Sequence, residues 1–154
     1  MSSVYSRRAA RGAVIAAVYA VTTIVLAPIS YGMVQVRVAE ALTLLPILFP
    51  EAIWGLFLGC LISNFFGGMG PIDIFLGSLT TLVAAWLTYR WRGSRLAYVP
   101  PIALNGLVVG TYLSYLLQVN LLLCILSVSA GQAVAVLGLG IPLLRRLRKV
   151  YRQE

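Results

Sequence analysis

The chain has 154 residues, of which 60% are hydrophobic and 10% charged, and its mean hydropathy is +0.94. A soluble domain of this length cannot hide so much apolar surface from water, so the composition predicts an integral membrane protein. The net charge of +8 could suggest nucleic-acid binding. The arginines cluster beside apolar segments, however, at residues 7–11, 90–95 and 145–152, which is the pattern of membrane topology and argues against it.

Six apolar segments follow one another along the chain. A membrane helix needs roughly 20 apolar residues, and fewer where neighbouring helices shield it. In chain order we predict helices at about 12–29, 38–49, 52–68, 72–89, 97–117 and 120–144. The breaks between them fall at proline and glycine, as at Pro28, Pro50 and the turn 67–71. We therefore expect the whole chain, 1–154, to be a single integral membrane domain, an all-α protein with six transmembrane helices.

The arginine clusters predict the orientation, because Lys and Arg near the ends of spans collect on the cytoplasmic side. Six spans place both termini and residues 90–95 inside, and leave the loops near 30–37, 67–71 and 118–120 outside. The first apolar segment continues into further spans without a convincing cleavage site, so we expect it to remain as a helix rather than be removed as a signal peptide.

Small residues recur at helical spacing in the first predicted helix. Ala9, Ala13 and Ala17 form one such series, and Ala16 and Ala20 form another. This small-xxx-small pattern lets a second helix approach closely within lipid. The sequence alone leaves two interpretations open, namely a docking surface for a partner protein and packing within the chain's own bundle.

Polar side chains in the apolar segments are the candidates for a binding site, because burying them in hydrocarbon is costly and they usually face the bundle interior or a water-filled cavity. Arg37 and Glu40 stand at the outer start of the second segment and, at a spacing of three, can pair on one helix face. The loop before them carries Gln35 toward the same level. Glu51 differs, since it follows Pro50 at the predicted cytoplasmic turn and suits the positive end of the third helix.

Further polar residues reach a similar depth from the other segments. Asn64 closes the third segment and Asp73 opens the fourth, where it can also serve simply as a helix cap. Asn105 and Gln132 fall nearer the middle of the last two segments, and Tyr112 lies two helical turns after Asn105 on the same face. Together they would line a polar pocket open to the outside. The alternative is that each side chain only bonds a neighbouring helix.

Missing motifs exclude several kinds of chemistry. The sequence has no histidine and no G-x-x-x-x-G-K-[ST], GxSxG or HExxH motif, so we expect no P-loop ATP binding and no enzymatic activity. Cys60 and Cys124 lie in apolar runs and are interpreted as apolar filler rather than as a disulfide or metal pair. We expect neither a cofactor nor a metal ion, which leaves a binding and translocation subunit.

Three stretches resemble the queuosine-precursor transporter (QueT) family, whose members are substrate-binding S components of energy-coupling factor (ECF) transporters. They are LAPISYGMVQVRVAEALTLLPILFPEAIWGLFLGCLISNFFGG at 26–68, GPIDIFLGSLTTLVAAWLTYR at 70–90, and PP-x-x-x-N at 100–105. The resemblance implies a six-helix S component of a bacterial cell membrane that binds substrate from outside and joins a membrane coupling protein and two ATPases. Ala9, Ala13 and Ala17 match the positions where S components carry small residues that dock on the coupling protein.

The substrate implied by the resemblance is a 7-deazaguanine base or queuine. The N1–H and exocyclic amine of such a ring are adjacent donors that one carboxylate accepts in parallel, and we assign this role to Glu40. Arg37 is expected to orient Glu40 or donate to the ring carbonyl, and Tyr112 to stack on the ring. The remaining edges of the base would be read by Asn64, Asn105 and Gln132. Two alternatives stay open: an S component for a different small vitamin, and a membrane scaffold or enzyme outside transport.

Overall fold

The computed structural model describes residues 2–31 and 35–151, and in these ranges all regular structure is helical. The predicted all-α fold class is therefore confirmed. Three helices are long and apolar enough to cross a membrane, Val4–Val25, Arg95–Leu117 and Leu121–Tyr151. The six-span count and the orientation remain predictions.

The first half of the described chain contains two long helices and two short helical segments. In order these are α1 (Ser2–Val25), α2 (Ala27–Ser30), the 3-10 helix η1 (Val38–Ile47) and α3 (Ala52–Gly67). The first helix begins well before the predicted residue 12, because its basic start is rich in alanine and arginine, which both favour helix. It ends before the predicted residue 29, since the ring of Pro28 cannot continue an α-helical ladder.

The second half forms three continuous helical stretches, over residues 71–90, 95–117 and 121–151. Each stretch contains a π-helical segment in which the backbone bonds to the fifth residue back. The elements are η2 (Asp73–Gly77, π), α4 (Ser78–Arg90), η3 (Arg95–Tyr98, 3-10), α5 (Val99–Leu104), η4 (Asn105–Val109, π), α6 (Gly110–Leu117), α7 (Leu121–Ala133), η5 (Val134–Gly140, π) and α8 (Ile141–Tyr151).

Helices α1 and α3 pack closely against each other, and glycine makes this possible. A Cβ atom added at Gly59 would lie 2.8 Å from the carbonyl oxygen of Ala16 and 2.8 Å from the Cβ of Tyr19. One added at Gly55 would lie 2.6 Å from the carbonyl oxygen of Gly12. The series Ala16 and Ala20 is buried, whereas Ala9, Ala13 and Ala17 are exposed. The two small-residue series therefore differ in role: Ala16 packs inside the bundle, and the other series stays on its surface.

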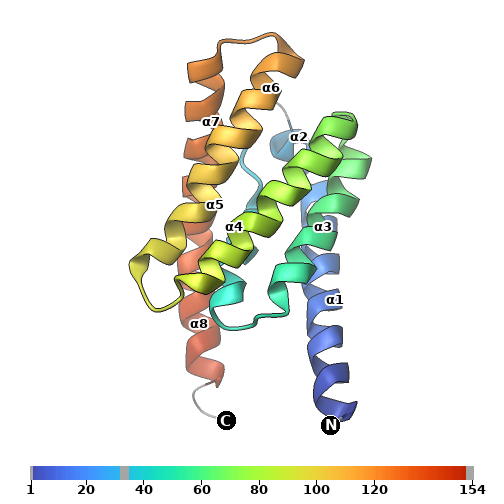
Figure 1. The fold of residues 1–154 in the computed structure, drawn as a ribbon, viewed down its shortest axis with the longest axis vertical. Helices are drawn as coiled ribbons and strands as arrows, with labels where there is room; N and C mark the ends of the chain where they lie inside the picture. Colours follow the sequence, from blue (N-terminus) through green and yellow to red (C-terminus); the bar gives the residue numbers. More distant parts are fainter. Residues whose placement is uncertain (1, 32–34, 152–154) are drawn as a thin grey trace.

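Both ends of the bundle are recognisable in Figure 1. The start of α1, the end of α8 and the loop between α4 and α5 lie at the lower end, while the turns after α3 and α6 lie at the upper end. At the lower end Arg11 forms an ion pair with Glu51, with 2.7 Å between Nη1 and Oε1. Glu51 is the N-cap residue of α3 but makes no capping hydrogen bond. Glu51 therefore stabilises this end of the bundle by its ion pair with Arg11, and not by a capping hydrogen bond to the start of α3.

Candidate functional site

All eight predicted site residues are buried, with at most 7% of their surface exposed. They come from the segment before η1, from η1 itself, and from the helices that follow. The residues are Gln35, Arg37, Glu40, Asn64, Asp73, Asn105, Tyr112 and Gln132. Burying so many polar groups in an apolar bundle costs free energy unless they bond one another or a ligand.

One network centres on Arg37. Its Nη1 donates to Oδ1 of Asn64 at 3.0 Å and its Nε donates to the carbonyl oxygen of Ser30 at 3.0 Å. Its Nη2 lies 3.8 Å from Oδ1 of Asp73, and the hydroxyl of Tyr112 donates to that same oxygen. Asn64 also donates to the carbonyl oxygen of Asp73 at 2.9 Å. This buried ion pair therefore has hydrogen-bond support on both sides, which a buried pair requires.

A second network centres on Glu40. The hydroxyl of Tyr19 donates to Oε1 at 2.5 Å, and Nδ2 of Asn105 lies 3.5 Å from Oε2. Gln132 lies within reach of the same carboxylate, and the guanidinium of Arg37 is close enough to attract it. Helix α1, η1 and the last two helical stretches thus meet at one carboxylate.

Cys60 lies between the two networks. Its Sγ accepts a weak hydrogen bond from Asn64 at 3.5 Å and another from the hydroxyl of Thr81 at 3.4 Å. Gly77 also borders the cluster, because an added Cβ would lie 2.9 Å from Nδ2 of Asn64 and 2.9 Å from the hydroxyl oxygen of Tyr112. Both cysteines are free, as expected, and Cys60 contributes a polarisable acceptor rather than only filling space.

Among the described residues, three buried side-chain atoms of this region have no hydrogen-bond partner, namely Ser30 Oγ, Asp73 Oδ2 and Gln132 Oε1. Leaving such an atom unpaired costs about 1–3 kcal/mol, so each one marks a place where a partner is missing. A carboxylate oxygen and an amide oxygen accept hydrogen bonds and do not donate them. The site consequently has two unused acceptors and suits a molecule that offers N–H or O–H donors.

The sequence model of a family described as QueT transporter matches residues 9–149. The chain belongs to the QueT transporter family. A curated relative, the queuosine precursor transporter QueT of Lactococcus lactis subsp. cremoris, is 38% identical over 73 residues, which make up 46% of this chain and 43% of the relative. No solved structure matches the chain.

The π-helical segments of this QueT-family chain coincide with the cluster. Asp73 and Asn105 each open a π segment, and Gln132 stands two residues before η5. Such segments occur often at functional sites, because an extra residue in the turn redirects the side chains that follow. The predicted shared face of Asn105 and Tyr112 is altered in this way, since Asn105 points to Glu40 and Tyr112 to the carboxylate of Asp73.

Two sequence interpretations are wrong in detail. Arg37 does not pair with Glu40 across a helix face, because it is the extended N-cap residue of a 3-10 helix and its guanidinium contacts Asn64 and Asp73 instead. Asp73 makes no capping hydrogen bond, since its carboxylate faces Arg37 and Tyr112. Gln35 is buried next to the cluster, where its backbone carbonyl packs against Gly131.

The predicted pocket open to the outside is not the arrangement that the structure describes. The candidate side chains contact one another and are almost fully shielded from solvent. Their burial makes each hydrogen bond electrostatically stronger than it would be in water. It also means that a ligand would reach them only after the surrounding elements separate.

Tyr19 belongs to the cluster but was not singled out by sequence reasoning. It is fully buried in the middle of α1 and donates to Glu40. A tyrosine in an apolar helix gives no sign of its partner, because its ring alone explains its presence there. The sequence feature that could have pointed to Tyr19 is Glu40, because a buried carboxylate needs hydrogen-bond donors from neighbouring helices.

The exposed alanines lie on the outer side of α1. Ala9 and Ala13 line a shallow groove of about 260 Å³ together with Gly12, Gly55 and Trp54. Ala17 continues the same exposed series one turn further along. Small side chains on both helices keep the groove open, which leaves room for the close approach of another helix.

Proposed function

We propose that this QueT-family chain is the substrate-binding S component of an ECF-type importer for queuosine precursors, namely 7-deazaguanine bases or queuine. The observation that carries the proposal is the buried Glu40 carboxylate, with the unpartnered acceptors Asp73 Oδ2 and Gln132 Oε1 in the same cluster. The family match and the name of the Lactococcus relative support the same class of substrate.

The donor pattern of the base fits these acceptors. Each oxygen of Glu40 receives one hydrogen bond, from Tyr19 or Asn105, and has a lone pair left. The N1–H and exocyclic amine of a deazaguanine can therefore bond both oxygens in parallel while Tyr19 stays in place. Arg37 would donate to the ring carbonyl, and Gln132 would accept a remaining N–H. A site built on such acceptors rejects analogues that lack the matching donors.

The closed cluster implies that binding begins with a movement of the bundle. A ligand would replace hydrogen bonds inside the cluster, such as that of Tyr112 to Asp73, with bonds to the base. The apparent dissociation constant is then the intrinsic constant divided by the fraction of molecules that are open, so a rarely opened cluster weakens the apparent affinity. Tyr112, once released, has its ring available to stack on the base.

Transport would need a source of energy outside this chain, since its sequence has no P-loop. In the proposed assembly a membrane coupling protein and two ATPases supply it. The exposed series Ala9, Ala13 and Ala17 would be the surface that docks on the coupling protein. The chain would be a multi-pass protein of the bacterial cell membrane, with both termini in the cytoplasm.

The direct test is equilibrium binding with the purified chain in detergent. We expect saturable binding of 7-cyano- or 7-aminomethyl-7-deazaguanine or of queuine, and none of riboflavin, biotin, thiamine or folate. Guanine, which shares the donor edge, is the matched competitor. Saturable binding of a vitamin without binding of any deazaguanine would mean an S component of different specificity. Binding of none of these ligands would favour a scaffold or an enzyme.

Replacing Ala13 by leucine should impair transport and leave substrate binding unchanged. The larger side chain would fill the exposed groove beside Gly12 and Gly55 without touching the buried cluster. We expect weaker co-purification of the coupling protein and slower uptake into cells. Val21→Leu, at another exposed position of α1, is the control. Loss of substrate binding in Ala13→Leu would show that this surface supports the fold, and unchanged uptake would remove it from the docking interface.

A further inference from the structure

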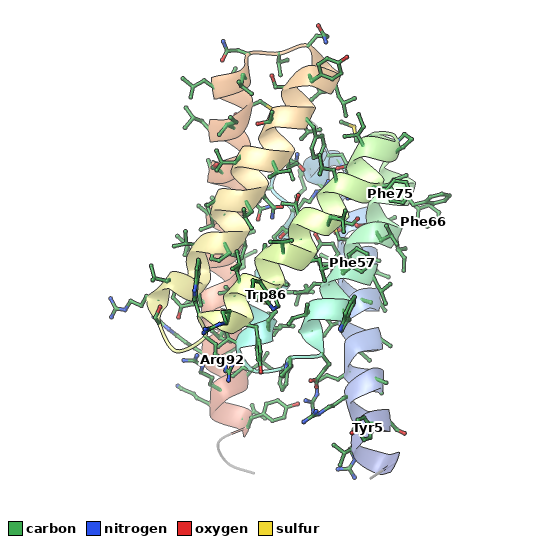
Figure 2. All side chains as sticks on the ribbon, in the orientation of Figure 1. Tyr5, Phe57, Phe66, Phe75, Trp86 and Arg92 are labelled. Carbon is green, nitrogen blue, oxygen red and sulfur yellow. The ribbon has the colours of Figure 1, made fainter. Side chains whose placement is uncertain are left out.

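Three arginines surround a small pocket away from the polar cluster. Arg92 and Arg95 come from the loop and the first turn after α4, and Arg148 comes from α8. The pocket has a volume of about 180 Å³ and is completed by Ser94 and Tyr98. Figure 2 shows Arg92 at the end of the bundle where α4 stops, well away from Phe66 and Phe75.

The described carboxylates do not neutralise this pocket. Glu40 and Asp73 bond inside the polar cluster, and Glu51 pairs with Arg11. The remaining acidic residue, Glu154, lies outside the described residues. Three positive charges around one polar pocket repel one another, and a bound anion would relieve that repulsion.

The three arginines that line the pocket have the side chain that binds phosphate groups best. The guanidinium of Arg92 lies 4.2 Å from the ring centroid of Tyr89 and donates to its carbonyl oxygen at 3.3 Å. These contacts restrain it in one position. Guanidinium groups bind phosphate oxygens in a bidentate manner, so several of them around one pocket suit a phosphate better than a single carboxylate.

The surroundings of the pocket indicate a lipid rather than a soluble phosphate. Arg95 begins one helix that is apolar enough to span a membrane, and Arg148 lies near the end of another. Next to them Trp91, Leu96 and Val99 expose 40%, 60% and 48% of their surfaces. Tryptophan collects at the level of lipid headgroups, and exposed aliphatic side chains there would contact acyl chains. Basic pockets at the ends of membrane helices bind anionic headgroups.

We propose that the pocket formed by Arg92, Arg95 and Arg148 binds the phosphate of an anionic phospholipid headgroup. The lipid's acyl chains lie along the exposed apolar residues beside it. The bound lipid links the loop after α4 to α8 and fixes the depth of this end of the bundle in the membrane. The proposal is independent of the transported substrate.

The test is a lipid titration of the full chain in detergent, read by native mass spectrometry. Phosphatidylglycerol should bind more tightly than phosphatidylcholine. Arg95→Gln and Arg148→Gln should each weaken phosphatidylglycerol binding by roughly fivefold, since each basic residue near a membrane surface contributes about 1 kcal/mol. The triple variant R92Q/R95Q/R148Q should show no preference between the two lipids. Arg145→Gln and Arg146→Gln, exposed on the same helix but not lining the pocket, are matched controls and should keep the preference.

Three results would overturn the proposal. Equal losses in the control variants would mean that general positive charge attracts the lipid. An unchanged preference in the triple variant would place the lipid elsewhere. Displacement of phosphatidylglycerol by equimolar inorganic phosphate would identify a site for free phosphate instead of a lipid. Thermal unfolding of each variant without added lipid distinguishes these outcomes from misfolding.

Discussion

Glu40→Gln is expected to weaken the binding of a 7-deazaguanine base by more than about tenfold. A hydrogen bond to a charged group contributes roughly 1.5–3 kcal/mol, and the glutamine amide presents one acceptor oxygen where the carboxylate presents two. Glutamine has nearly the same shape, so the packing against Tyr19 and Asn105 is disturbed little. The measurement is equilibrium binding in detergent, by calorimetry or by tryptophan fluorescence.

Two variants separate the proposed role of Glu40 from general effects. Glu51→Gln removes the other glutamate of the described chain, which pairs with Arg11 far from the cluster, and should leave affinity unchanged. Tyr19→Phe keeps the Glu40 charge and removes one of its donors, so its effect should be smaller than that of Glu40→Gln. Unchanged affinity in Glu40→Gln would remove this carboxylate from the binding site.

Much of the helical architecture could be predicted from the sequence. Apolar runs and the prolines and glycines between them are strong signals, and the structure places helical stretches over each predicted segment. The ends were less predictable, because the basic residues that flank the apolar runs are good helix formers and extend α1 and α8. The type of helix was not predictable, since neither the 3-10 form of η1 nor the π segments have a distinctive spacing of apolar residues.

The members of the buried cluster could be selected from the sequence, because a polar group in an apolar run must find a partner. Which of these side chains bond to one another could not be predicted from the sequence. The pairing depends on side-chain directions that the π segments change, as for Asn105 and Tyr112, and on the extended backbone at Arg37. The role of Tyr19 could not be predicted either, because an apolar helix accommodates its ring without any polar partner.

Asp73→Asn is expected to destabilise the fold by about 3–5 kcal/mol, because it leaves a buried guanidinium without its nearest counter-ion. Arg37 and Asp73 are 7% and 1% exposed at their side chains, so water cannot take over the lost interaction. Tyr112 would also lose a charged acceptor. The measurement is thermal or denaturant unfolding of the purified chain in a fixed detergent.

A double variant shows whether the loss comes from the ion pair itself. Combining Asp73→Asn with Arg37→Met removes both charges, so that no charge is left buried without its counter-ion. We therefore expect the double variant to be more stable than Asp73→Asn alone. The changes in unfolding free energy of the two single variants should then not add up to that of the double variant, as is usual for residues in direct contact. If the two single losses simply add, the charges do not interact, and the 3.8 Å contact between Arg37 and Asp73 contributes nothing to stability. Asn64, which bonds both residues, would then hold this part of the cluster together.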